Sequence, residues 1–153
     1  MMYRWPLELR GRAAIAQAKL AYQAFRTTFS GPRWEALAAD GAAVQRPLWA
    51  STSTKNPAYP DTLYVDELIG PDSVNTLPDA TIDAFVDHGT VARTIDLHLD
   101  EADAVWAGLA AVGVDMNDVA AKLEREGVAS FIASFDDLLT ALEQKATALR
   151  QDS

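Results

Sequence analysis

The sequence predicts an α/β protein in which two short parallel strands alternate with helices and a helical tail follows. The apolar run Pro47–Ala50 is too short for a helix and passes directly into a polar stretch, which is typical of a buried strand that opens into a loop. A second strand is expected at 73–77, after a short helix. We therefore expect a single segment over 1–153, with two β/α units within 10–90 and a helical tail over 100–150.

A long amphipathic helix is expected before the first strand, starting at Gly11. Its apolar residues are spaced by three and four and define one face: Ile15, Ala18, Tyr22, Phe25 and Phe29. We place Lys19 and Gln23 on the opposite, polar face. The run Ser30-Gly31-Pro32 then ends this helix and begins a shorter one.

Each predicted strand is followed by a helix with an acidic residue at its start. Asp61 and Asp79 both come directly after a proline and suit N-cap positions. The helix after Asp79 ends at Gly89 and is expected to direct three apolar side chains inward: Ile82, Phe85 and Val86. This order of strands and helices is typical of consecutive units of a parallel sheet.

Three helices are expected in the tail. The first begins with Asp100–Asp103, which is similar to a capping box, and ends at Gly113. A second begins at the cap Asp115 and ends at Gly127. The last carries a long apolar face: Val128, Phe131, Phe135, Leu138, Leu142 and Leu149.

Composition narrows the class of protein. The 153 residues are 49% hydrophobic and 23% charged, which suits one globular domain, and no cysteine is present to form disulfides or a thiolate nucleophile. Positive charge predominates up to Lys55, with 8 Lys/Arg against 3 Asp/Glu, and negative charge after it, with 5 against 19. The net charge of −9 argues against a nucleic-acid partner.

The sequence also predicts a cytoplasmic protein. Its longest charge-free run, Ala104–Val114, is far below the roughly 18 residues of a membrane helix. The first ten residues contain both acids and bases and no apolar core segment, unlike a secretory signal. We therefore expect no membrane partner.

The polar stretch after the first strand is the candidate site. Hydroxyls, one cation and an amide, from Ser51, Ser53, Lys55 and Asn56, suit an anion such as a phosphate. The alternative is a Ser/Thr turn that caps the next segment. The spacing alone leaves both interpretations open.

No catalytic residue and no metal site is expected. A Schiff-base lysine must be desolvated so that its amine is neutral, and Lys19, Lys122 and Lys145 lie on amphipathic helices while Lys55 lies in a hydroxyl-rich loop. Neither histidine, His88 or His98, has a second histidine or a carboxylate pair at ligand spacing. We therefore expect both histidines to be structural.

Three stretches of this chain resemble bacterial transaldolases. The stretch Arg46–Pro57 is similar to the seventh barrel strand of that family and the loop after it, and Val74–Pro78 is similar to the eighth. Gly11–Tyr22 is similar too, and the resemblance runs from about Leu9 to near the C-terminus. It implies the last two β/α units of an incomplete (β/α)8 TIM barrel with a C-terminal helical tail. The first six strands, and the strand-four lysine that forms the family's Schiff base, have no counterpart here.

The resemblance implies transaldolase chemistry in the pentose phosphate pathway. Such a transferase moves a dihydroxyacetone unit between sugar phosphates, without cofactor or metal, and holds the substrate phosphate with the hydroxyl and cation of this loop. The family pattern often reads Ala-Ser-x-Arg-Asn-Pro, whereas this chain has Lys55 in place of the arginine and two additional loop residues. Lysine offers a point charge rather than a bidentate fork.

We expect this chain to be inactive alone, because the Schiff-base lysine is missing. The alternative class is a non-catalytic remnant, or a phosphate-binding module that complements another chain. The expected partners are a sugar phosphate and either a second copy or an N-terminal chain that supplies the missing strands.

Overall fold

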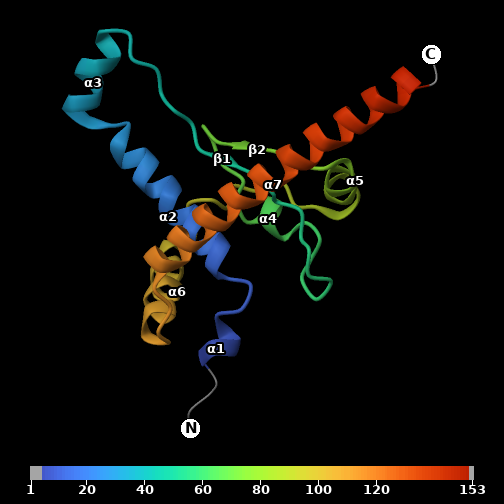
Figure 1. Cartoon of the computed structure of the whole chain (residues 1–153). Coiled ribbons are helices and arrows are strands. Elements are labelled where there is room, and N and C mark those ends of the chain that lie inside the picture. The colour runs from blue at the N-terminus through green and yellow to red at the C-terminus, as the bar shows by residue number, and fades with distance from the viewer. Residues whose placement is uncertain (1–4, 152–153) are drawn as a thin grey trace. The chain divides into compact units, whose positions relative to one another are not determined.

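The computed structural model describes residues 5–151, and Figure 1 shows the order of their helices and strands. The chain divides into two compact units, and the division falls between Val112 and Gly113. The first unit contains α1 (Trp5–Glu8), α2 (Ala13–Thr28), α3 (Gly31–Ala39), β1 (Leu48–Trp49), α4 (Leu63–Asp66), β2 (Val74–Asn75), α5 (Asp79–His88) and α6 (Leu99–Ala111). The second contains α7 (Met116–Gln151).

The two strands pair in parallel, as the sequence predicts. Leu48 lies opposite Val74 and Trp49 lies opposite Asn75. The Val74 amide donates to the Pro47 carbonyl at 2.9 Å, and the Thr76 amide donates to the Trp49 carbonyl at 3.0 Å. Both strands are shorter than the apolar run Pro47–Ala50 and the expected strand at 73–77. Among the described residues each strand pairs only with the other, so the outer edge of each strand has no strand beside it.

Helices α2 and α6 pack against each other and form one of two small cores (Figure 1). Its buried residues are Leu9, Ala16, Ala102 and Val105, with Leu20 and Leu109 packed against them. Small side chains at Ala16 and Ala102 allow the two helix backbones to approach closely. The helix that begins near residue 100 therefore belongs to the first compact unit, and only α7 belongs to the second.

The second core joins α2 to the sheet. Tyr22, Leu68 and Ile95 are buried here, and partly buried side chains pack around them: Ile15, Ala18, Phe25 and Trp49. The Tyr22 hydroxyl donates to the Pro71 carbonyl at 2.9 Å, so this buried phenol keeps a hydrogen-bond partner. A Cβ at Gly70 would overlap the Ile95 side chain, so a larger residue there would displace this core residue.

The placement of Lys19 on the polar face of its helix is wrong. Lys19 is only 4% exposed, and its ammonium donates to Glu67 Oε2 at 3.0 Å and to the Leu97 carbonyl at 3.2 Å. A spacing of four from Ile15 and three to Tyr22 places Lys19 on the apolar face. Its methylene stem is buried there while its charged end reaches a carboxylate.

Two apolar side chains of α5 do not point inward as expected. Ile82 is 43% exposed and Val86 is 80% exposed, whereas Thr81 is the buried residue of this helix. Leu48 of β1 is also exposed, at 54%, although the sequence suggested a buried strand. With only two strands, this sheet cannot cover the apolar residues that the sequence supplies for it.

The expected helix caps are correct only in part. Asp115 caps α7, since its Oδ1 accepts the Asn117 amide at 2.8 Å. Asp79 lies in the first turn of α5, and Pro78 holds the cap position without a side-chain hydrogen bond. Thr62, rather than Asp61, precedes α4. The predicted start at Asp100 is also displaced, because α6 begins one residue earlier, after His98.

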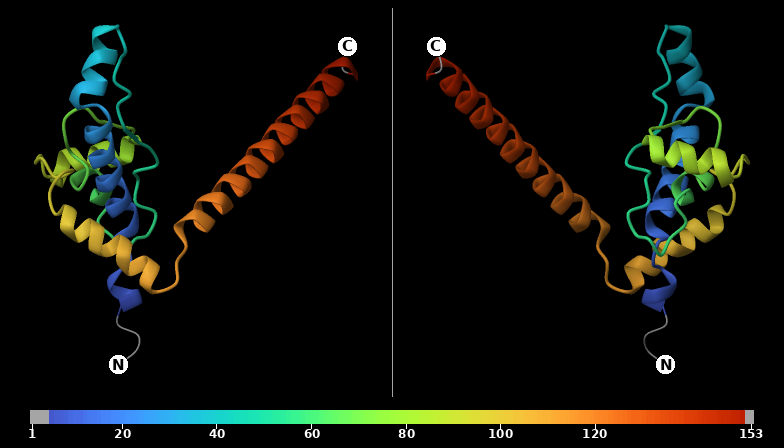
Figure 2. Two further views of the ribbon diagram at one scale, coloured as in Figure 1. Left: turned by 90° about the vertical axis from the view of Figure 1, so that its left-hand side faces the viewer. Right: turned by 90° about the vertical axis from the view of Figure 1, so that its right-hand side faces the viewer.

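The predicted helix end at Gly127 is wrong, since α7 is one continuous helix of 36 residues (Figure 2). Gly113 does adopt a positive φ, of 88°, just after α6, but Gly127 does not adopt one. A glycine inside a helix costs about 1 kcal/mol, which the strong helix formers on both sides offset. None of the helices in the described part of the chain has the length and hydropathy needed to span a membrane.

Candidate functional site

The candidate phosphate loop, residues 50–60, leaves the carboxyl end of β1. Because β1 and β2 run in parallel, the carboxyl end of β2 lies at the same edge of the sheet. A cavity of about 430 Å³ lies beside the loop, and its lining includes Leu48, Tyr59, Tyr64 and residues 50–56. This is the edge at which ligands bind in parallel α/β proteins.

Exposure differs sharply between neighbouring residues at the start of the loop. Ser51 and Lys55 are exposed and Ser53 is half-buried, whereas Thr52 is only 5% exposed. The Thr52 hydroxyl lies 2.7 Å from Asn75 Oδ1 and 3.0 Å from the Thr76 carbonyl, and both partners belong to the end of β2. The loop is therefore tied to the neighbouring strand at the position between the two serines.

The structure brings together two of the four predicted ligands. The Lys55 ammonium donates to the Ser53 hydroxyl oxygen at 3.2 Å. Asn56 instead uses its side-chain oxygen locally, to accept the Ala58 amide at 3.0 Å, as in the turn that was the alternative interpretation. Ser51 has a φ of 58°, in the left-handed region that residues with a side chain seldom adopt.

The carboxyl-terminal end of the loop, near Pro60 and Asp61, is held by one contact from a hydroxyl and one from an imidazole. The Thr54 hydroxyl donates to the Pro60 carbonyl at 2.9 Å. His88, at the end of α5, contacts Asp61 Oδ1 through Nε2 at 2.8 Å and Asp87 Oδ2 through Nδ1 at 3.1 Å. Both hydrogen bonds raise the pKa of His88, and the bond with Asp61 has the larger effect. The same bond lowers the pKa of Asp61.

The structure places two carboxylates beside His88 that spacing along the sequence did not indicate. The two carboxylates come from Asp61, which lies far from His88 in sequence, and from the adjacent Asp87. Even so, no group of three or more His, Asp or Glu residues in the described part of the chain could hold a metal ion. The contacts around His88 join α5 to the end of the loop.

Sequence reasoning missed the residues that support this site. Thr52, Thr54 and Asn75 were not singled out, yet they fix the loop at both ends. One signal was available, because in Ser-Thr-Ser-Thr each serine is followed by a threonine, and alternate residues of an extended chain point to opposite sides. Thr52 is the buried member of this run, and Ser51 before it is exposed.

None of the described lysines has the setting of a Schiff-base lysine. Lys19 is buried, but its ammonium is already engaged with Glu67 Oε2 at 3.0 Å and with the Leu97 carbonyl at 3.2 Å. Lys55, Lys122 and Lys145 are exposed. A nucleophilic amine needs a position that is dry and that also lets it lose its proton.

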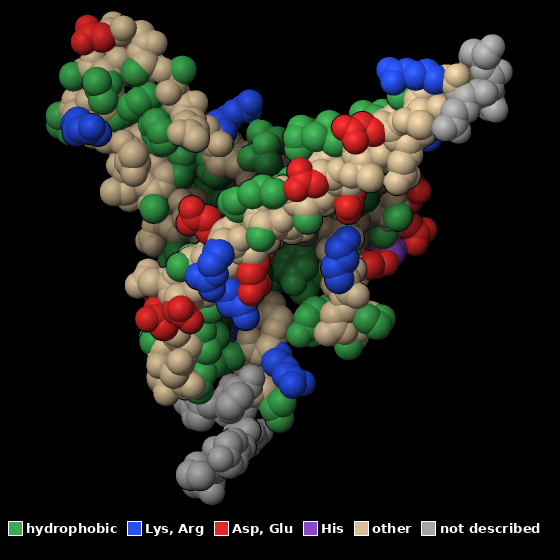
Figure 3. Space-filling view, in the orientation of Figure 1, with side chains coloured by type: hydrophobic (Ala, Val, Ile, Leu, Met, Phe, Trp, Pro, Cys, Tyr) green, Lys and Arg blue, Asp and Glu red, His purple; other side chains and the backbone are tan. Residues whose placement is uncertain are grey.

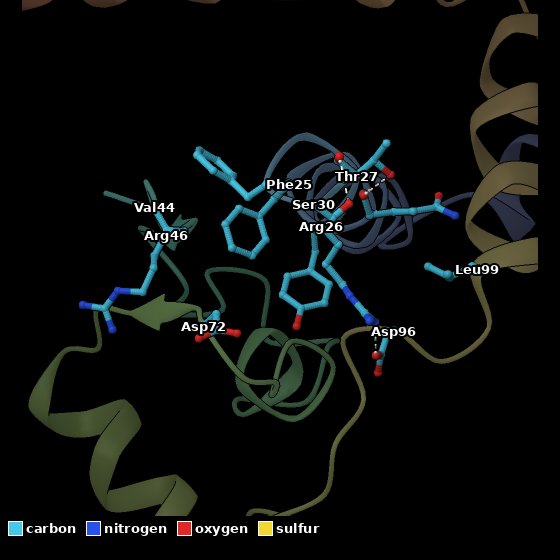
Figure 4. A pocket seen from close by; sticks show the side chains of 12 residues that line it. Phe25, Arg26, Thr27, Ser30, Val44, Arg46, Asp72, Asp96 and Leu99 are labelled. Carbon is cyan, nitrogen blue, oxygen red and sulfur yellow. Dashed lines mark hydrogen bonds and ion pairs between the residues drawn. The ribbon is translucent and has the colours of Figure 1, made fainter. Parts of the chain in front are cut away.

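A larger cavity, of about 880 Å³, lies at the opposite, amino-terminal end of the strands. Figure 4 shows its lining, in which Arg26 reaches from α2 toward Asp96. The Arg26–Asp96 distance is 3.3 Å, and Arg93 pairs with the same carboxylate and lowers its pKa. Because Arg26 and Arg93 are both engaged with Asp96, and a second carboxylate, Asp72, lines the same cavity, it is a poorer candidate for an anion than the loop after β1.

Comparison with known proteins agrees with the resemblance. A sequence model of the transaldolase/fructose-6-phosphate aldolase family matches residues 3–142. A transaldolase of Frankia alni is 55% identical over 138 residues, which is 90% of this chain and 37% of that protein. Transaldolases of Thermobifida fusca and Acidothermus cellulolyticus are 51% and 48% identical, over 92% and 95% of this chain.

These relatives are much longer than the stretch that matches. The chain spans 37% of the Frankia protein, 38% of the Thermobifida protein and 40% of the Acidothermus protein. This agrees with a resemblance to one portion of the enzyme rather than to the whole. By the extent of the family match and the level of identity, the chain belongs to the transaldolase/fructose-6-phosphate aldolase family.

Proposed function

We propose that this chain is the C-terminal part of a transaldolase-type (β/α)8 barrel and carries its substrate-phosphate loop. The observation that carries the proposal is the loop at the carboxyl edge of two parallel strands, with Ser51, Ser53 and Lys55 on its accessible side. Hydroxyls and one ammonium match the acceptor oxygens and negative charge of a phosphate. The ligand class is a sugar phosphate, and the setting is the cytoplasm.

Phosphate titration of the labelled full chain tests this site. One cation with a few neutral donors is expected to bind in the millimolar range, about −4 kcal/mol. Inorganic phosphate should shift the NMR signals of residues 51–56, and Lys55→Ala should remove those shifts. Lys122→Ala, which removes an exposed lysine of α7, is the matched control and should leave them unchanged. Shifts that persist in Lys55→Ala would place the anion elsewhere.

The chain alone is proposed to lack transaldolase activity, because none of its described lysines combines a dry site with freedom from a carboxylate partner. In a complete enzyme of this family, the lysine of an earlier strand forms the covalent intermediate with the ketose. Borohydride trapping with fructose 6-phosphate should therefore leave the mass of the chain unchanged. A covalent adduct on any lysine would contradict this part of the proposal.

The second candidate is a non-catalytic module that binds phosphate and complements another chain. The exposure of Leu48 and the open edge of β1 favour it, since a further parallel strand would cover both. The partner is then a chain that supplies further parallel strands, or a second copy of this chain. Light scattering and denaturant unfolding over a range of protein concentrations separate these cases from a stable monomer, whose unfolding would be cooperative and independent of concentration.

A further inference from the structure

The hydroxyls of the phosphate loop fall into two sets that differ in their surroundings. Thr52 and Thr54 direct their hydroxyls to fixed acceptors elsewhere in the chain: the end of β2 for Thr52, and the Pro60 carbonyl for Thr54. Ser51 precedes Thr52 and Ser53 lies between the two threonines, and both serines are more exposed than Thr52. Of these four consecutive hydroxyl residues, the two threonines bond to other parts of the chain and the two serines are available to a ligand.

The contact at Thr52 is the stronger of the two anchors. Its side chain is buried, and its oxygen lies within hydrogen-bond distance of a side-chain oxygen and a backbone oxygen of the neighbouring strand. A hydroxyl has one hydrogen, so the Thr52 hydroxyl donates to one of these two oxygens at a time. If the Asn75 amide is turned by 180°, its NH2 group donates to the Thr52 oxygen, and the Thr52 hydroxyl donates to the Thr76 carbonyl. In each arrangement the hydroxyl joins the exit of β1 to the exit of β2.

Ser51 needs such an anchor beside it. Its φ of 58° is in the left-handed region, which costs conformational energy for a residue with a Cβ and persists only where the surroundings fix it. Thr52 is the next residue and is the point at which the backbone is tied down. The left-handed turn at Ser51 redirects the chain just as it leaves the strand, and it begins the loop that brings Ser53 within 3.2 Å of Lys55.

We infer that Thr52 and Thr54 are positioning residues of the phosphate site, which hold Ser51, Ser53 and Lys55 in their binding arrangement without contacting the anion themselves. The inference rests on the proposed phosphate site and adds the residues that preorganise it. Donors that are already in place lose less conformational entropy when the ligand binds, so the anchors increase the affinity by ordering the loop beforehand. The ligand class is a phosphate monoester or inorganic phosphate.

The test uses the full chain with inorganic phosphate as the probe and compares Thr52→Val with Thr52→Ser. Valine keeps the shape of threonine and removes the hydroxyl, whereas serine keeps the hydroxyl. Thr52→Val should weaken phosphate binding about fivefold, the factor that corresponds to one net hydrogen bond, and Thr52→Ser should bind within about twofold of wild type. Unfolding is measured for both variants, so that affinity is compared between folded proteins.

A purely structural role gives a different pattern. In that case Thr52→Val would lower the unfolding midpoint and leave the phosphate affinity of the folded chain unchanged, which would overturn the inference. If Thr52→Val does not fold, Thr54→Val replaces it, because Thr54 is only half-buried. It should weaken binding in the same way, and unchanged binding in this variant would also overturn the inference.

Hydrogen exchange of the backbone amides separates the inference from the proposed function. Without phosphate, the amides of residues 51–56 should exchange faster in Thr52→Val than in wild type, and the control Lys122→Ala should leave their exchange unchanged. If wild type fails to bind phosphate, the proposed site is wrong, and faster exchange in Thr52→Val would still support the anchor. Equal exchange in wild type and Thr52→Val would exclude the anchor itself.

Discussion

The first compact unit and α7 use their apolar residues in opposite ways. In the first unit Ile95 and Tyr22 are 0% and 2% exposed, and they lie among residues from several segments. None of residues 116–150 in α7 is buried, and Figure 3 shows hydrophobic side chains along this helix. The exposed residues include Leu123, Val128, Phe131, Ile132, Phe135, Leu138, Leu139, Leu142 and Leu149.

The difference shows what helical periodicity does and does not predict. Spacings of three and four predicted an apolar face on both α2 and α7. On α2 that face is covered, because Leu68, Ile95 and helix α6 pack against it. The apolar face of α7 is not covered by any other element of its own compact unit. Periodicity therefore identifies the face, and only tertiary contacts decide whether its burial contributes to stability.

The largest expected effect comes from a comparison of Ile95 with Phe131. Ile95→Ala should lower the free energy of unfolding by about 2 to 5 kcal/mol, because it leaves a cavity in a closed core. Phe131 is 81% exposed, so Phe131→Ala should change it by less than about 0.5 kcal/mol in dilute solution. Denaturant unfolding measures both. A large loss in Phe131→Ala would show that the α7 face is covered in solution.

Two ion pairs provide a comparison of intermediate size. In the Lys19–Glu67 pair the side chains are 5% and 43% exposed, whereas in the Lys122–Glu126 pair both side chains are 60% exposed. Lys19→Met should cost about 1 to 2 kcal/mol, since it removes hydrogen bonds from a charged group at a mostly buried position. Lys122→Met should cost at most about 0.5 kcal/mol, as for exposed pairs on a helix. Equal costs in chemical denaturation would contradict the assignment of Lys19 to the core.

The smallest expected effect is the pH dependence of the contact between His88 and Asp61. The pKa of His88 is raised from 6.5, so its contribution is complete below that value and is lost as the pH rises through the raised pKa. The pKa of Asp61 is lowered from 3.8, so its contribution is present above that value and is lost as the pH falls through the lowered pKa. The pair therefore stabilises the fold most between about pH 4 and 6.5.

His88→Gln should remove this dependence. Its unfolding midpoint should lie below that of wild type in the acidic window and should converge with it at alkaline pH. Asp61→Asn is the matched variant, since it removes the same contact from the other side. Both groups are exposed, so the difference should be small. A constant difference at all pH values would show that His88 acts through packing.

The sequence predicted the class of the fold and the position of the loop, because these depend on local patterns. The apolar run before Ser51 and the helical spacing of α2 are local, and the family motif lies within one stretch of chain. The parallel pairing of the strands is confirmed. The predicted site remains a prediction, although the structure does place Ser53 and Lys55 in contact.

What could not be predicted depends on contacts between distant segments. Thr52 looked like one more hydroxyl in a polar loop, and its importance appears only when β2 lies beside it. The pairing of His88 with Asp61 requires the end of α5 to approach the start of α4. Lys19 was a different kind of error, since its position on the apolar face was available from the helical period and its charge was given too much weight.

The parallel pair of strands also has a consequence for the order of folding. Pairing Leu48 with Val74 closes a loop of about 25 residues, which costs roughly 3 kcal/mol of chain entropy for a flexible loop. The bonds to the Pro47 and Trp49 carbonyls contribute only about 1 kcal/mol each. The ladder therefore cannot nucleate folding. We therefore expect the short sheet to form together with the packing of Tyr22, Leu68 and Ile95, whose burial supplies the stabilisation that two hydrogen bonds do not.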